Sequence, residues 1–119
     1  MKRVFFSSVD ATDANQNLSK YIAIGKWAFY DRGVIPIMPH FNSLIIDLST
    51  DKGALNGKLA SKDMIFYANE MWVLGNKRDE RIKEEIQLAK ILKIRIRYFS
   101  NKEISKILKK YGGTTIHVE

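Results

Sequence analysis

The chain has 119 residues, of which 45% are apolar and 28% charged, with no cysteine and a formal net charge of +7. This length and composition predict one globular domain, residues 1–119, and exclude disulfides and thiolate metal sites. The apolar runs are far too short to span a bilayer, and the basic, apolar start lacks the pattern of a signal peptide. We therefore expect a cytoplasmic protein with no membrane partner.

The positive charge is concentrated in the C-terminal third. Residues 76–110 hold 12 Lys or Arg and 5 Asp or Glu, whereas the remainder holds 8 of each sign. Such a concentration indicates either a surface for phosphate groups or only the solvated faces of two amphipathic helices. Because few aromatic residues are interleaved with these charges, we expect no more than weak, non-specific, salt-dependent binding to nucleic acid.

Strands and helices alternate along the sequence. Short apolar runs predict strands at 4–6, 34–37, 70–74 and 94–99. Helical spacing and capping residues predict helices from Asp13 to Gly33, from about 50 to 67, from 79 to 92 and from 100 to 110. Residues 41–49 are expected to form a loop or short helical turn over the mouth of a pocket. The alternation predicts an α/β fold with a parallel sheet and helices on both faces.

Two finer expectations concern the order of these elements in space. Proline at position 36 predicts that the strand 34–37 lies at a margin of the sheet or is short. In the helix 50–67, we expect the larger apolar side chains to face the core, namely Leu55, Leu59, Ile65 and Phe66. The tail 114–118 is expected to be an edge strand, a subunit contact or a frayed end.

Three polar junctions follow predicted strands and should meet at the carboxyl edge of the sheet, where open α/β proteins bind ligands. The candidate ligand-binding residues at these junctions are Ser7, Ser8, Asp10, His40, Gly75, Arg78 and Arg81. The alternative is that the serines only form turns and that His40 is structural. The first junction contains neither a dinucleotide-binding glycine motif nor a P-loop, and no spacing suits a metal. We therefore predict no cofactor and no metal site.

Three phrases in the sequence carry a family resemblance: Gly33-Val-Ile-Pro-Ile-Met-Pro-His40, Glu70-Met-Trp-Val-Leu-Gly75 and Glu85-Ile-Gln-Leu-Ala-Lys90. In order and spacing they resemble the nucleoside 2-deoxyribosyltransferase-like superfamily, and especially its small, often phage-borne branch. The resemblance covers most of residues 2–99. It implies a flavodoxin-like fold and a homo-oligomer whose sites are completed across a subunit contact. Pattern and resemblance together predict a flavodoxin- or Rossmann-like three-layer sandwich with a four- to five-stranded parallel sheet.

The same resemblance implies a reaction. Enzymes of this superfamily cleave the N-glycosidic bond of a nucleoside through a covalent sugar intermediate on a glutamate in the pattern Asp-x-Gly-x-x-x-Glu. Asp79 and Glu85 match the two acids, and Arg81 stands in place of the glycine. Glu85 would be the nucleophile, and Asp79 would orient or protonate the base. Alternatively, Arg81 and Glu85 pair, because they lie four residues apart on one helix face.

Three functions are consistent with these patterns. The first is a nucleoside- or nucleotide-binding protein that cleaves or transfers at the N-glycosidic bond. The second is a catalytically degenerate member of the same superfamily that binds a nucleotide or another protein through the same cleft. The third is a basic nucleic-acid-binding module.

Overall fold

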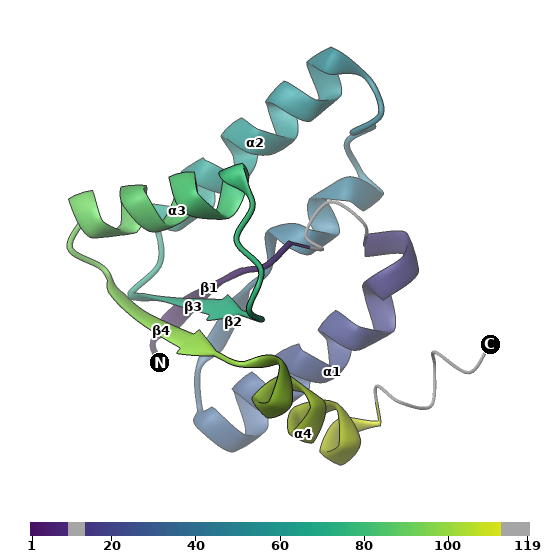
Figure 1. Ribbon diagram of the computed structural model, residues 1–119, viewed down its shortest axis with the longest axis vertical. Coiled ribbons are helices and arrows are strands. Elements are labelled where there is room, and N and C mark those ends of the chain that lie inside the picture. The colour runs from purple at the N-terminus through teal and green to yellow at the C-terminus, as the bar shows by residue number, and fades with distance from the viewer. Residues whose placement is uncertain (10–13, 113–119) are drawn as a thin grey trace.

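The computed structural model describes residues 1–9 and 14–112. Its four strands, β1 (Arg3–Ser7), β2 (Ile35–Ile37), β3 (Glu70–Leu74) and β4 (Arg95–Phe99), form an all-parallel sheet in the order β2-β1-β3-β4. Four α-helices and one 3-10 helix connect or follow them: α1 (Ala14–Arg32), η1 (Pro39–Leu44), α2 (Asp51–Ile65), α3 (Glu80–Ile91) and α4 (Asn101–Tyr111). The predicted α/β fold with a parallel sheet is confirmed, with four strands (Figure 1).

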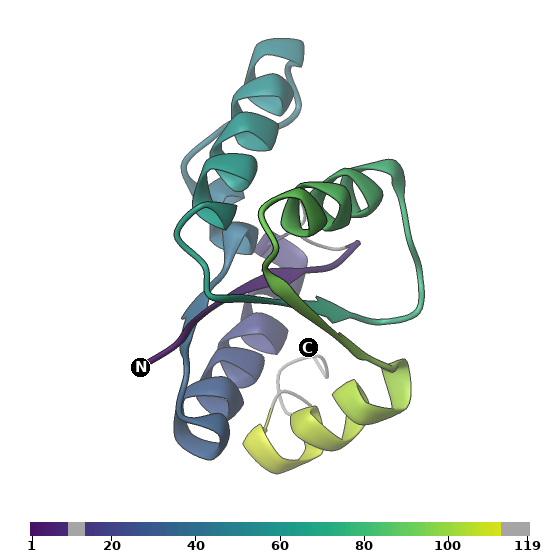
Figure 2. The same ribbon diagram turned by 90° about the vertical axis from the view of Figure 1, so that its left-hand side faces the viewer.

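The sheet lies between two helical layers. Helices α1 and α4 cover one face, and α2 and α3 lie on the other (Figure 2). Side chains alternate along β3, so that Trp72 and Leu74 pack toward α1 and α4 whereas Met71 and Val73 pack toward α2 and α3. Every residue of β3 is buried, as expected for a central strand of a parallel sheet. This arrangement is the predicted Rossmann- or flavodoxin-like three-layer sandwich.

Proline places β2 at the edge of the sheet. β2 has three residues and, among the residues that the structure describes, pairs with β1 alone, with Pro36 opposite Val4. Proline has no N–H to donate to a second neighbouring strand, which confines it to an edge. The predicted position at the sheet margin is therefore confirmed.

Capping residues define the ends of the helices. The Asp79 side chain accepts a 2.8 Å hydrogen bond from the Ile82 N–H and so begins α3. The predicted capping box of Ser100 and Glu103 is present at the start of α4. Gly33 follows α1 with a φ of +64°, which glycine adopts without steric cost. The predicted cap at Asp13 and the tail 114–118 lie outside the described residues.

The orientation predicted for α2 is largely wrong. Ile65 is buried, but Leu55, Leu59 and Phe66 are 56%, 56% and 60% exposed. The first turns of α2 extend beyond the sheet, and the helix packs against η1 and α3 (Figure 1). Of the four large apolar side chains predicted to face the core, only Ile65 at the end of the helix does so.

Small residues occupy the inward side of α2 instead. Gly53 and Ser61 are buried, and Gly57 lies one turn from each. A Cβ on Gly53 would lie 1.6 Å from the carbonyl oxygen of Asp47, and one on Gly57 would lie 2.5 Å from a methyl group of Leu48. The segment before α2 thus approaches the helix backbone so closely at Gly53 that glycine is required there, whereas at Gly57 the near atom belongs to the end of the Leu48 side chain. The pattern of hydrophobic residues in the sequence does not predict how closely residues 47 and 48 approach the backbone of α2.

Candidate functional site

Glu85 of α3 is joined to the end of β1. Its carboxylate accepts a 2.6 Å hydrogen bond at Oε1 from the Ser7 hydroxyl and a 2.8 Å hydrogen bond at Oε2 from Nη1 of Arg81. The Glu85 side chain is only 1% exposed and that of Arg81 is 16% exposed. Both carboxylate oxygens of Glu85 are thus engaged inside the protein, and the alternative pairing of Arg81 with Glu85 is the one observed.

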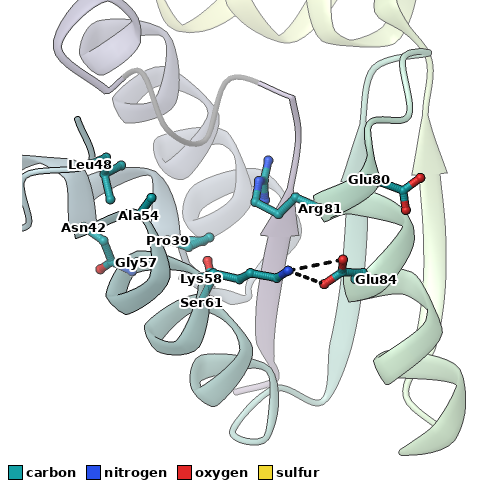
Figure 3. Close-up of a pocket in the computed structure, with 10 residues that line it drawn as sticks. All are labelled: Pro39, Asn42, Leu48, Ala54, Gly57, Lys58, Ser61, Glu80, Arg81 and Glu84. Carbon is teal, nitrogen blue, oxygen red and sulfur yellow. Dashed lines mark hydrogen bonds and ion pairs between the residues drawn. The ribbon is translucent and has the colours of Figure 1, made fainter. Parts of the chain in front are cut away.

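Arg81 also reaches past Glu85 to the backbone of the first junction. Its Nη2 donates to the carbonyl oxygen of Ser8. Figure 3 shows the Arg81 side chain extending from α3 toward β1. One guanidinium therefore neutralises a buried carboxylate and fixes the residue that follows β1, using the fork of donors that distinguishes arginine from lysine.

Burial dominates the ionisation of Glu85. Removal from water raises the pKa of the Glu85 carboxyl, while the Arg81 charge and the hydrogen bond from Ser7 oppose that rise. A raised pKa means that the folded state binds a proton more readily than the unfolded chain. Glu85 therefore lowers the stability of the folded state as it becomes ionised.

This linkage gives a pH prediction for Glu85→Gln, a variant that cannot ionise at this position. We expect the free energy of unfolding of the wild type, relative to that of the variant, to fall as pH rises above 4.5, the usual pKa, through the raised value. Urea unfolding of both proteins across a pH series measures the difference. A difference that is flat or that grows with pH would contradict it.

His40 and Ser8 belong to a second buried cluster. The Ser8 hydroxyl lies 2.8 Å from the Tyr21 hydroxyl and 2.9 Å from Nε2 of His40. The rings of Tyr21 and His40 stack with their centroids 3.9 Å apart. His40 is fully buried and Ser8 is 3% exposed. The cluster joins η1, α1 and the end of β1, which is the arrangement that the structural alternative for His40 describes.

The third junction is held by its own residues and by the neighbouring end of β4 and start of α4. Gly75 has a φ of +88°, and a Cβ there would lie 3.1 Å from Oδ1 of Asn101. Arg78 donates to the carbonyl oxygen of Gly75 at 2.6 Å, and its guanidinium lies 5.4 Å from the centre of the Tyr98 ring. Asp79 uses its carboxylate to cap α3. These contacts shape the turn between β3 and α3. Asp10, the remaining predicted residue, lies outside the described residues.

A cavity of about 410 Å³ opens between η1, α2 and α3. We call it the α2–α3 cleft (Figure 3). One part of its wall is apolar, formed by Pro39, Leu48 and Ala54. The polar lining includes Arg81 and Lys58, and Lys58 pairs across the cleft with Glu84 at 2.9 Å. A cavity of this volume with an apolar wall and polar groups at its margin is typical of small-molecule sites.

The predicted residues meet at one edge of the sheet but do not share one cavity. Arg81 lines the α2–α3 cleft, whereas Ser8 and Gly75 line a cavity of about 320 Å³ on the other face of the sheet. Sequence reasoning missed the contributions of α2, because it assigned the wrong face of that helix to the core. The spacing of Gly53, Gly57 and Ser61 at four-residue intervals was the available signal for the inward face.

Within residues 1–9 and 14–112, no three His, Asp or Glu side chains lie close enough together to hold a metal ion. The helices in these ranges include none that is both long and apolar enough to cross a membrane.

Comparison with known proteins gives one family and no function. A search of curated proteins found no match to the chain. The model of a domain of unknown function, DUF7768, matches residues 2–99, from the start of the sheet through the last strand. Because the match covers most of the 119 residues, this chain belongs to the DUF7768 domain family.

Proposed function

We propose that the protein binds a nucleoside or nucleotide in the α2–α3 cleft. We further propose that Glu85, beside the cleft, has a structural role and joins α3 to the end of β1. The structural role of Glu85 rests on one observation. Both of its carboxylate oxygens accept hydrogen bonds, from Ser7 and from Arg81, and its side chain is only 1% exposed. A glycosidic nucleophile needs a carboxylate oxygen about 3 Å from the anomeric carbon, in line with the bond that breaks. Of the three functions considered, the geometry favours the catalytically degenerate binding protein.

Three features support the ligand class. The cleft lies beside the carboxyl ends of the strands, where open α/β sheets bind ligands. Pro39, Leu48 and Ala54 offer an apolar wall to a base and sugar. Arg81 and Lys58 offer hydrogen-bond donors to a ligand, but Arg81 is paired with Glu85 and Lys58 with Glu84. The lining carries no excess positive charge, so it does not favour a nucleotide over a nucleoside. The resemblance to the nucleoside 2-deoxyribosyltransferase-like superfamily supports the same class. That resemblance also underlies the expectation of a homo-oligomer, which stays a prediction.

Ligand binding is testable with a thermal-unfolding panel of deoxynucleosides and deoxynucleoside monophosphates. We expect saturable stabilisation by at least one nucleoside or monophosphate, equivalent to about 2.7 kcal/mol at a hundred times its Kd. The variant Ala54→Trp fills the cleft and should abolish the shift. Leu55→Trp is the matched control, because Leu55 is the next residue, is exposed and does not line the cleft. No shift with any compound at millimolar concentration would contradict the proposal.

The structural role of Glu85 is tested separately with labelled deoxynucleosides and deoxynucleotides. We expect neither free base nor a glycosyl adduct on Glu85 after prolonged incubation. Release of free base by the wild type that is lost in Glu85→Gln would instead establish the N-glycosidic activity. Ligand binding by Glu85→Gln, measured in the same panel, distinguishes loss of chemistry from loss of affinity.

A further inference from the structure

A pocket of about 250 Å³ lies on the α1–α4 face of the sheet, beside the amino ends of its strands. Lys2 precedes β1, Glu70 is the first residue of β3, and Arg32 is the last residue of α1. These three side chains line the pocket together with Trp72 and Arg97. The α2–α3 cleft lies at the other ends of the strands, so this pocket is a separate site.

Aromatic rings hold the two arginines at fixed positions. The Arg32 guanidinium lies 5.2 Å from the centre of the Trp27 ring and 5.5 Å from that of Trp72. The Arg97 guanidinium lies 5.5 Å from the Trp72 ring and 5.7 Å from that of Phe99. Strand register explains the second contact, because Trp72 and Arg97 are directly paired on neighbouring strands. The two guanidinium groups therefore share one indole ring.

The side chains that line this pocket carry more positive than negative charge. Glu70 lines it, but its carboxylate already accepts a 2.7 Å hydrogen bond from Lys2 and a 2.9 Å hydrogen bond from Nε1 of Trp72. Asp31, next to Arg32 in the sequence, pairs with Lys110 at 2.7 Å. In the described part of the chain, neither Arg32 nor Arg97 forms an ion pair with a carboxylate. The charged side chains that line the pocket are thus three cations and one carboxylate.

We propose that Arg32 and Arg97, with Lys2 at the rim, bind the phosphate group of a small molecule. Planar guanidinium groups match phosphate oxygens with paired donors, and an anion between two cations relieves their mutual repulsion. The end of α1 contributes about half a negative charge, which is less than the excess positive charge of the side chains. The pocket is smaller than the α2–α3 cleft, which favours a phosphate with a short carbon skeleton over a nucleotide.

Inorganic phosphate is the probe that tests this site. Phosphate replaces chloride in the titration so that the ionic strength stays constant, and tryptophan fluorescence and thermal unfolding are followed. We expect a saturable change, since Trp72 contacts both arginines. Arg32→Gln and Arg97→Gln should each raise the half-saturating phosphate concentration at least tenfold. The matched control is Arg3→Gln, because Arg3 is exposed at the start of β1, donates to the carbonyl oxygen of Tyr67 and does not line the pocket; the expected change is less than threefold.

Two further measurements keep the result unambiguous. Urea unfolding verifies that each variant is folded, and Arg97→Lys, which keeps the charge and loses the planar fork, should bind with intermediate affinity. In a parallel experiment, binding of a single-stranded DNA 12-mer without terminal phosphate is measured for the same variants. The proposal is overturned if the half-saturating phosphate concentration is the same for the wild type and both Gln variants. It is also overturned if the two Gln substitutions weaken DNA binding and leave phosphate binding unchanged. Ala54→Trp alters the α2–α3 cleft and leaves this pocket unaltered. Failure of the nucleotide-binding proposal would therefore be distinguishable from failure of the phosphate-binding proposal.

Discussion

Replacing Arg81 by methionine is expected to lower the free energy of unfolding by about 3–5 kcal/mol. The substitution keeps an unbranched apolar stem but leaves the Glu85 carboxylate, 1% exposed, without its cationic partner. An unpaired charge in such a position retains its full cost of burial, and the Ser8 carbonyl oxygen loses a donor as well. In a domain of this size, the midpoint of thermal unfolding should fall by roughly 10 °C or more.

A double-mutant cycle separates this mechanism from simple loss of packing. Adding Glu85→Gln to Arg81→Met removes the unpaired charge, so the double variant should be more stable than Arg81→Met alone. Lys83→Met is the control on the same helix, because the Lys83 side chain is 61% exposed and its ammonium lies 4.0 Å from the Glu80 carboxylate. That control should change stability by less than about 0.5 kcal/mol. If Arg81→Met costs no more than Lys83→Met, the pair does not stabilise the junction.

The fold was predictable where local patterns and tertiary structure agree. The continuous apolar run 70–74 reads as a buried parallel strand, and β3 has the bounds Glu70–Leu74. Asp79 and Ser100 begin helices in the structure because an N-cap depends on neighbouring backbone N–H groups alone. The same reasoning failed in α2, where the position of Asp47 and Leu48 decides which side of the helix is inward.

The candidate site was predictable in position and only partly in contacts. Alternation of strands and helices was sufficient to bring the ends of β1 and β3 and the start of α3 to one edge of the sheet. The Arg81–Glu85 pair follows from their four-residue spacing. The hydrogen bond from Ser7 to Glu85 joins residues 78 positions apart, and no periodicity in the sequence encodes such a contact. The burial of Glu85, which decides its chemistry, depends on that long-range packing.

Trp72 is a large buried side chain whose contacts join distant parts of the sequence. We expect Trp72→Ala to lower the free energy of unfolding by about 3–5 kcal/mol. Trp72 is 2% exposed and packs against Phe6, Trp27 and Phe99, with ring centroids 5.1–5.5 Å apart. Truncation leaves a large cavity in the layer between the sheet and α1 and α4. It also removes the indole N–H from the carboxylate of Glu70. Urea unfolding, with a check that the m-value is unchanged, measures the loss.

Trp72→Phe divides this effect into its two parts. Phenylalanine retains an aromatic ring in the cluster but cannot donate to Glu70, so we expect a loss of about 1–3 kcal/mol, the cost of a buried acceptor left without its donor. Tyr98→Ala on β4 is the control, since Tyr98 is 52% exposed. Equal losses for Trp72→Phe and Trp72→Ala would place the stabilisation in the hydrogen bond to Glu70. Because Lys2 also donates to Glu70, that result would make the charged groups at the amino ends of the strands, and not the aromatic cluster, the main support of this layer.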